Sequence, residues 1–187
     1  MFVIAQERKR TLSAVPRPRS GEHSSPFKRT PFIREAIHVK YSYTYDSPVG
    51  RLYLAEENGV LTDLCFRPVP NAEERETPLL KRTVLQLTEY FNGKRHDFDL
   101  PLDPRGTPFQ KSVWSALLTI PYGETRSYKD IACAVGNTKA CRAVGMANNK
   151  NPISIIIPCH RVVGSGGVLT GYGGGLDIKR ALLELEK

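Results

Sequence analysis

The sequence has no long apolar segment, and this absence excludes one class of architecture. No apolar run approaches the ~18 residues that a membrane-spanning helix needs, so neither a transmembrane helix nor a membrane partner is expected. The apolar run within the opening MFVIAQERKR is too short for the core of a secretory signal. Walker and dinucleotide-binding glycine patterns are also missing, so the glycine-rich stretches near the end of the chain do not predict a nucleotide site.

Cysteine and histidine are scarce, with four of each. They are scattered along the chain, and no C-x-x-C pair occurs. Such spacing favours reduced intracellular thiols over a disulfide framework or a zinc knuckle, and it predicts no metal site. The cysteines are Cys65, Cys133, Cys141 and Cys159.

Acidic residues are outnumbered, and the net charge is +8. Residues 1–40 hold nine Lys/Arg against three Asp/Glu, a balance of +6, which leaves +2 for residues 41–187. Residues 1–38 are also rich in proline and serine and lack apolar periodicity, so they are predicted to be a disordered basic tail. Such a tail could attract phosphate groups, although most basic runs of this kind are simply solvated segments.

Residues 39–100 are predicted to form a small α/β domain. Polar and apolar residues alternate from Val39 to Tyr45, and further strands are predicted over 51–56 and 60–66, with an Asn58-Gly59 hairpin turn between them. Thr77-Pro78 is typical of a helix start. No residue here suggests chemistry, so a scaffolding role is expected.

Residues 101–187 are predicted to form a second domain with helix-turn-helix spacing. Thr107–Gln110 and Ser127–Asp130 are capping boxes that open two helices, and a third is expected over 138–148, after a turn at Gly136-Asn137. A last helix covers 176–186. Glu186 stands in its final turn, where the helix dipole disfavours an acid unless a partner holds it.

The helix over 138–148 is unusually rich in small residues, with Arg142 as the long side chain in its middle. Ala140, Ala143 and Gly145 would let the helix approach a flat surface such as a groove wall. The alternative is a core helix whose Arg142 pairs with a carboxylate.

The segment 155–163 has two β-branched runs around Pro158-Cys159-His160-Arg161, and both runs are predicted to be buried strands. A cysteine at the end of a rigid element beside a histidine suits a nucleophile, because a thiol attacks as its thiolate and needs a base. A buried structural cysteine is the alternative. The glycine-rich segments 164–167 and 171–175 suggest a lid over a pocket.

Several motifs carry a family resemblance: GTPFQKSVW, IPYGETRSY, KACRAVGMANNKNP, IIIPCHRVVG and GYGGGLDIKRALL. The span 106–186 resembles the methylated-DNA–protein-cysteine methyltransferases. The resemblance implies an α/β two-domain fold, with a small ribonuclease-H-like sheet-plus-helix domain followed by a helix-turn-helix or winged-helix-like domain that holds the cysteine. The first domain matches only generally, and residues 1–38 have no counterpart.

The chemistry implied by this resemblance is DNA repair by direct reversal. Cys159 would take the alkyl group from O6-alkylguanine, or less well O4-alkylthymine, in duplex DNA, once and irreversibly, with no metal or organic cofactor. His160 would relay a proton through a water from Cys159 towards Glu186. Tyr128 would donate to the departing guanine, and Asn151 would order the turn before the cysteine.

The resemblance also implies that the target base is flipped out from the minor-groove side, with Arg142 filling the vacated stack. A glycine at position 173 predicts room for larger alkyl groups. Further DNA contacts are expected from Ala140, Ala143, Gly145, Lys139, Thr107, Ser165 and Tyr128, and the alkyl pocket from Tyr172, Gly173, Pro158 and Val162.

Three other functions compete with the DNA-repair interpretation. A non-catalytic alkylated-DNA-binding relative would lack Cys159. A transcription regulator of the same family would carry a cysteine-rich zinc module, but no cysteine precedes Cys65. A Cys-His hydrolase would turn over esters repeatedly. We expect a monomer with no obligate protein partner, located in the cytoplasm at the nucleoid, or in the nucleus of a eukaryote.

Overall fold

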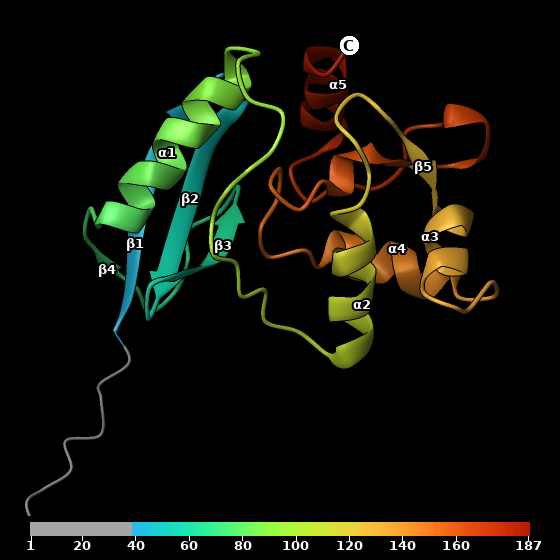
Figure 1. The fold of residues 1–187 in the computed structure, drawn as a ribbon, viewed down its shortest axis with the longest axis horizontal. Coiled ribbons are helices and arrows are strands. Elements are labelled where there is room, and N and C mark those ends of the chain that lie inside the picture. The colour runs from blue at the N-terminus through green and yellow to red at the C-terminus, as the bar shows by residue number, and fades with distance from the viewer. Residues whose placement is uncertain (1–38) are drawn as a thin grey trace, which may run out of the picture. The chain divides into compact units, whose positions relative to one another are not determined.

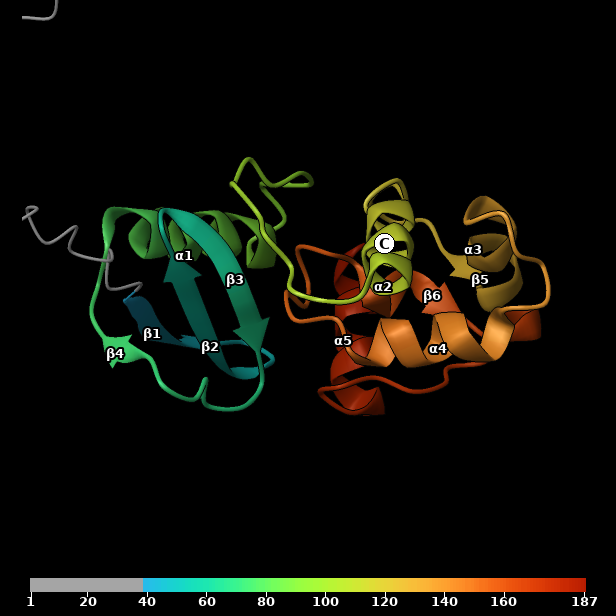
Figure 2. The same ribbon diagram turned by 90° about the horizontal axis from the view of Figure 1, so that it is seen from below.

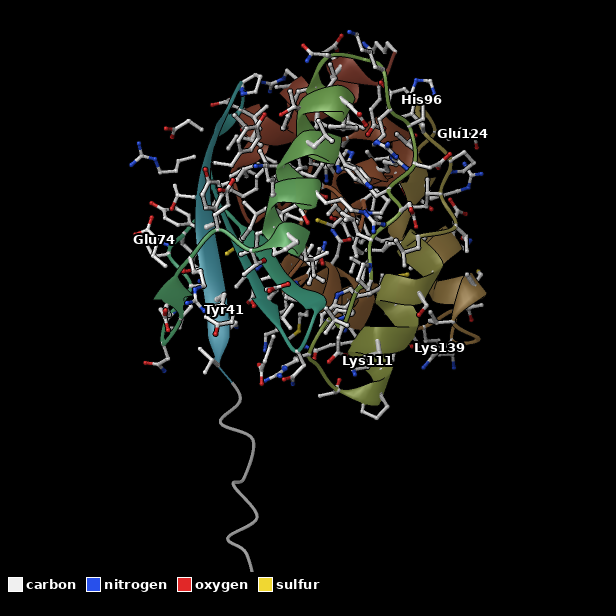
Figure 3. The ribbon with its side chains drawn as sticks, turned by 60° about the vertical axis from the view of Figure 1, so that its left-hand side comes forward. Tyr41, Glu74, His96, Lys111, Glu124 and Lys139 are labelled. Carbon is white, nitrogen blue, oxygen red and sulfur yellow. The ribbon has the colours of Figure 1, made fainter. Side chains whose placement is uncertain are left out.

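The computed structural model describes residues 39–187, so the predicted basic tail lies outside the described residues. The chain opens with an antiparallel meander of three strands, β1 (Lys40–Ser47), β2 (Gly50–Glu57) and β3 (Val60–Cys65). A two-residue strand, β4 (Glu73–Glu74), pairs parallel with β1, which gives the order β3-β2-β1-β4. Figure 3 labels Tyr41 and Glu74 on these two neighbouring strands. The strands predicted within residues 39–66 are confirmed.

The turn between β2 and β3 shows why the sequence predicted it. Asn58 and Gly59 have φ angles of 55° and 77°. A two-residue hairpin of the favoured type needs positive φ at both central positions, and Asn-Gly adopts it with little strain.

Helix α1 (Pro78–Phe91) covers one face of the sheet (Figure 1). It begins as predicted, because the Thr77 hydroxyl accepts a hydrogen bond from the backbone N–H of Leu80 at 3.2 Å. The side chains of Leu80 and Leu87 are fully buried and join Leu52 and Leu54 of β2 in the core. Burial of this apolar face stabilises the first domain.

The second domain is mainly helical (Figure 2). Helices α2, α3 and α4 pack against one another, and β5 and β6 form a short parallel ribbon. In chain order its elements are α2 (Pro108–Leu117), β5 (Arg126–Ser127), α3 (Tyr128–Ala134), α4 (Cys141–Asn149), β6 (Val162–Val163) and α5 (Leu176–Leu185). Both predicted capping boxes are present, at Thr107 and Ser127. The α/β two-domain fold with a helix-turn-helix is therefore confirmed.

The start of α4 differs from the prediction. The helix begins at Cys141 and not at Thr138. Asn137 shapes the preceding turn instead: its carbonyl accepts from the N–H of Ala140 at 3.0 Å, and its side-chain oxygen accepts from the N–H of Lys139 at 3.2 Å. The asparagine therefore caps a turn and not the helix.

The predicted strand over residues 155–157 is wrong. Ile155 has a φ of 72°, and the chain folds back so that the N–H of Ile157 donates to Ile153 at 3.0 Å. The three isoleucines are buried at 5% exposure or less, so their β-branched character reflects the core and not a sheet. Cys159–Arg161 is a 3₁₀ turn, η1, that leads into β6.

The segment before this turn is hydrogen-bonded to the outer edge of β3. The N–H of Leu64 donates to Pro152 at 2.8 Å, and the N–H of Ser154 donates to Leu64 at 2.8 Å. At the other end of β3, the N–H of Leu61 donates to Pro101. An edge strand presents unpaired backbone groups, and here the second domain and the linker pair with them. The loop that leads to Cys159 is thus anchored on the sheet.

Candidate active site

Cys159 is the first residue of the η1 turn and is 3% exposed. Its N–H donates to Ile157 at 2.7 Å, and its carbonyl accepts from the Asn148 side chain at 3.2 Å. Burial raises the pKa of the Cys159 thiol, and this effect outweighs the opposing influence of Asn151 and of the Lys179 charge. The resting thiol is therefore protonated at neutral pH and needs a base before it can attack.

Asn151 uses both ends of its amide to shape the turn before the cysteine. Its Nδ2 donates to the carbonyl of Ile157 at 2.8 Å, and its Oδ1 accepts from the N–H of Ile153 at 3.0 Å. The side chain is buried, so these bonds are shielded from water. The amide spans the turn that contains the positive φ of Ile155.

His160 and Glu186 form a buried pair. The His160 Nε2 lies 2.8 Å from Oε1 of Glu186, and both side chains are at most 1% exposed. Burial lowers the pKa of His160, so the ring is neutral at pH 7. Because an ionised carboxylate only accepts, Nε2 carries the proton, and Nδ1 is left with a lone pair. Within residues 39–187, Nδ1 has no hydrogen-bond partner. This leaves the histidine one free basic nitrogen.

Glu186 collects several donors, which explains an acid at the end of α5. Arg161 donates to it from Nε at 2.8 Å and from Nη2 at 3.0 Å, and the N–H of Gly123 lies at 3.3 Å. Burial alone would raise the pKa of Glu186, but hydrogen bonds from His160, Arg161 and Tyr90 lower it to about 2. Glu186 therefore has several hydrogen-bond donors as partners, where the sequence suggested one.

Tyr90 shows that the first domain contributes to this network, contrary to the purely scaffolding role expected from the sequence. Its hydroxyl, on α1, donates to Oε1 of Glu186 at 2.7 Å, and the residue is fully buried. No sequence signal indicates this contact, because the two residues are 96 positions apart. Arg161 was also missed, although its place next to His160 was a signal.

Lys179 is a third residue that sequence reasoning missed. It is fully buried on α5, and its Nζ donates to the carbonyls of Val162 at 2.6 Å and Thr170 at 2.8 Å. The Tyr128 hydroxyl, on α3, donates to the same Thr170 carbonyl at 3.2 Å. Lys179 thus ties the glycine-rich segment to β6 and to Tyr128. Its spacing of three and seven residues from Leu182 and Glu186 places all three on one helix face, which was an available signal.

An open pocket of about 230 Å³ borders Cys159. It is lined by Cys65, Phe66, Arg67, Asn148, Asn149, Asn151, Ser154, Cys159 and Gly173. Gly173 is where the sequence predicted it, and a Cβ there would meet only the Asn149 carbonyl, at 4.0 Å. Tyr172, which was also predicted to line this pocket, is buried and is not one of its lining residues; its ring lies 5.9 Å from that of Phe66.

Two further residues predicted for this pocket also lie elsewhere. Pro158 lines a separate cavity of about 380 Å³, together with Arg161 and His96. Val162 is fully buried in β6, where its carbonyl accepts from Lys179. The sequence predicted a strand on each side of Cys159, whereas residues 155–157 form a turn and Cys159–Arg161 form η1, and neither Pro158 nor Val162 lines the pocket.

The predicted DNA-contacting residues are placed on several elements. Arg142 and Ala143 are exposed on α4, and Gly145 lies close to the Tyr128 ring, since a Cβ on it would be 3.7 Å away. The prediction for Ala140 is wrong. Its side chain is 9% exposed and packs in the core, so it is not part of an exposed wall. No carboxylate within residues 39–187 pairs with Arg142, which disfavours the alternative of a paired core arginine.

Three further predicted contacts are exposed. Thr107 begins α2, Lys139 lies in the turn before α4, and Ser165 lies in a 3₁₀ turn after β6. Figure 3 labels Lys139 and Lys111 at the surface of this domain. In the described part of the chain, no three His, Cys, Asp or Glu side chains gather in a way that could hold a metal ion. The expectation that no metal or cofactor takes part stays a prediction.

The helix-turn-helix and the buried cysteine–histidine–glutamate arrangement define a class: DNA-binding proteins with a reactive cysteine. The 6-O-methylguanine DNA methyltransferase family model for the ribonuclease-like domain matches residues 39–104, and the model for the DNA-binding domain matches residues 108–187. The chain therefore belongs to the 6-O-methylguanine DNA methyltransferase family.

Relatives that are named methylated-DNA–protein-cysteine methyltransferases match most of the chain. The methylated-DNA–protein-cysteine methyltransferase of Mycobacterium bovis is 54% identical over 156 residues, 81% of this chain and 93% of its own length. The constitutive enzyme of Bacillus subtilis is 48% identical over 159 residues, covering 80% and 96%. The crystal structure of the Mycobacterium tuberculosis protein in complex with DNA is 53% identical, with a TM-score of 0.74, covering 79% and 92%.

Proposed function

We propose that this protein is a methylated-DNA–protein-cysteine methyltransferase that repairs O6-alkylguanine in duplex DNA by moving the alkyl group to Cys159. The single observation that carries the proposal is the Cys159 site itself. A buried thiol borders a pocket, and the next residue is a neutral His160 with a free Nδ1 and with Nε2 held by an ionised Glu186. The family membership supports the same conclusion. O4-alkylthymine would be a poorer substrate.

The transfer is a single displacement. Through a water, the Cys159 Sγ–H proton passes to Nδ1 of His160, and Glu186 stabilises the resulting imidazolium. The thiolate attacks the alkyl carbon, so that the S–C bond forms as the C–O6 bond breaks. Guanine leaves with the electron pair, and the Tyr128 hydroxyl donates to the base as negative charge develops. The thioether has no route to hydrolysis, so each molecule acts once.

The base must leave the stack to reach a buried thiol. We infer that α4 enters the minor groove, with Arg142 replacing the flipped base, while Ala143 and Gly145 allow close approach. Lys139, Thr107 and Ser165 would contact the DNA backbone. This mode reads little sequence, which suits a protein that must act wherever damage occurs.

Arg142→Ala is expected to slow transfer from duplex DNA by roughly 10–100-fold, because unstacking a base costs a few kcal/mol that the arginine would offset. Transfer from a free O6-alkylguanine base, which needs no flipping, should change little. Single-turnover rates on both substrates measure this. Arg180→Ala is the matched control, because Arg180 is exposed on α5 and pairs with Asp177 at 2.9 Å. Equal losses on both substrates would contradict a flipping role.

Intact-protein mass tests the proposed function. After incubation with a duplex that contains O6-methylguanine, the protein should gain one CH2 unit, because a methyl replaces the thiol proton. The gain should map to the Cys159 peptide and stop at one equivalent. DNA binding without any mass gain would instead identify a non-catalytic lesion-binding protein, and repeated turnover would refute the single-use mechanism.

Within residues 39–187, no helix is both long and apolar enough to cross a membrane. We propose that the protein acts as a monomer where the DNA is, at the nucleoid in the cytoplasm or in the nucleus of a eukaryote. The proposed reaction involves one molecule of protein and one lesion, so it needs no obligate protein partner.

A further inference from the structure

A second cavity, of about 170 Å³, lies next to the pocket of Cys159, where the two domains meet. Residues 67–70, which follow β3 in the first domain, line one side of it, and residues 149–152, at and after the end of α4, line the other. Arg67 borders both this cavity and the pocket of Cys159. The hydrogen bonds at the edge of β3 join the two sides and so fix their relative placement. We call this site the interdomain cavity.

The interdomain cavity carries a net positive charge. Arg67 and Lys150 are exposed, and within residues 39–187 no carboxylate pairs with either. Asp63 also lines the cavity, but Lys40 neutralises its charge at a distance of 2.6 Å. The cavity therefore has two unpaired cations, one from each domain, and this arrangement suits an anion such as a phosphate.

The cavity is continuous with the exposed face of α4 that carries Arg142. Asn149 is exposed, lines the cavity and follows Arg142 by seven residues, or two helical turns, so both lie on one face of the helix. Seven residues span about 10 Å of helix axis, and the phosphates of one DNA strand are spaced about 3.4 Å along the duplex axis. A duplex that follows α4 therefore places a phosphate at the cavity about three nucleotides from Arg142.

The end of α4 by itself would repel this phosphate. The last carbonyl groups of a helix carry a partial negative charge, and α4 ends at Asn149. Lys150, directly after the helix, and Arg67, from the first domain, supply the positive charge that offsets this repulsion. Neither domain provides both cations, so the site exists only because the two domains pack together.

We propose that the interdomain cavity is a backbone-phosphate site, in which Arg67 and Lys150 hold the DNA about three nucleotides from the flipped base. This inference rests on the proposed function, which places α4 in the minor groove. The guanidinium of Arg67 binds the phosphate through two parallel hydrogen bonds, whereas Lys150 acts as a point charge. Lys139 contacts the backbone before α4 in the same mode, so the duplex is held on both sides of Arg142. The first domain thereby becomes part of the DNA-binding surface.

Replacement of single phosphates by neutral methylphosphonates tests this contact. The replaced positions lie about two to four nucleotides from O6-methylguanine, on either strand and on either side, and duplex binding is measured for each. For the unaltered protein, one position should weaken binding about tenfold, because a charge-assisted contact is lost. In Arg67→Met the same replacement should cost only about twofold, since its main partner is already absent. Arg67→Met should also lower the magnitude of the slope of log K against log salt by about 0.9, the value for one phosphate.

Lys81→Met is the matched control, because Lys81 is exposed on α1 and lines neither the interdomain cavity nor the pocket of Cys159. Its sensitive phosphate and its salt slope should match those of the unaltered protein. Lys150→Met should reduce the penalty at the same phosphate as Arg67→Met, and a different sensitive phosphate for the two variants would contradict a shared site.

The inference is overturned if the unaltered protein has no sensitive phosphate, if Arg67→Met leaves the penalty unchanged, or if its salt slope equals that of Lys81→Met. Slower transfer from a free O6-alkylguanine base in Arg67→Met would also overturn it, because that substrate has no phosphate. Failure of the proposed function appears separately, as duplex binding by the unaltered protein without the gain of one CH2 unit.

Discussion

Cys159→Ser is expected to abolish alkyl transfer, lowering the rate by more than ~10⁴-fold, while binding to the damaged duplex persists. A serine hydroxyl is a much weaker acid than a thiol, so a neutral His160 cannot generate its alkoxide to a useful extent. The replacement is nearly isosteric, and the hydroxyl fits the space of a side chain that is 3% exposed. Intact-protein mass and duplex binding, measured on the same sample, separate the two properties.

Cys133→Ser is the matched control, because Cys133 is an exposed free thiol on α3. This variant should take up one methyl group at the rate of the unaltered protein. A methyl found on a Cys133, Cys141 or Cys65 peptide when Cys159 is absent would show that the protein has a second acceptor, and the assignment of Cys159 as the sole nucleophile would be wrong.

Glu186→Gln is expected to lower the free energy of unfolding by roughly 3–5 kcal/mol at pH 7, because it leaves the buried Arg161 charge without its carboxylate. It should also slow transfer, since the amide stabilises the His160 imidazolium less well than a carboxylate. Urea unfolding and single-turnover rates measure the two effects. Tyr90→Phe is the milder control: it removes one donor to Glu186, keeps both charges, and should cost about 1 kcal/mol.

The pH dependence follows from the direction of the two pKa shifts. The pKa of Glu186 falls from 4.5 to about 2 on folding, so its stabilising contribution is complete above pH 4.5 and is lost as pH falls towards 2. Folding also lowers the pKa of His160 below 6.5, so the unfolded chain binds an extra proton below pH 6.5, which adds to the loss. The stability gap between the unaltered protein and Glu186→Gln should therefore close in acid. A gap that stays constant down to pH 2 would contradict the ionised pair.

Local signals predicted the regular elements well. The caps at Thr77, Thr107 and Ser127 and the Asn58-Gly59 turn depend on residues at most four apart, so their geometry is a property of the local chain. Where a prediction relied on composition, as with the strand over 155–157, burial and strand pairing could not be told apart.

The surroundings of the cysteine needed the tertiary structure. The segment that leads into the turn at Ile155 is hydrogen-bonded to the edge of β3, and neither Pro158 nor Val162 lines the pocket of Cys159. Ala140 was expected on an exposed wall, but it stands at the N-cap of α4 and belongs to the core cluster. None of these outcomes has a local signal, since each depends on contacts between segments far apart in the chain.

The sequence by itself determined the family resemblance, the helix-turn-helix spacing and the adjacency of Cys159 and His160, because these are set by residues close together in the chain. Only the tertiary structure decided that Tyr90 from the first domain completes the Glu186 network and that Arg67 reaches the pocket. The physical reason is that the electrostatics of a buried site depend on which charges and dipoles folding brings together, and here those groups come from both domains of the chain.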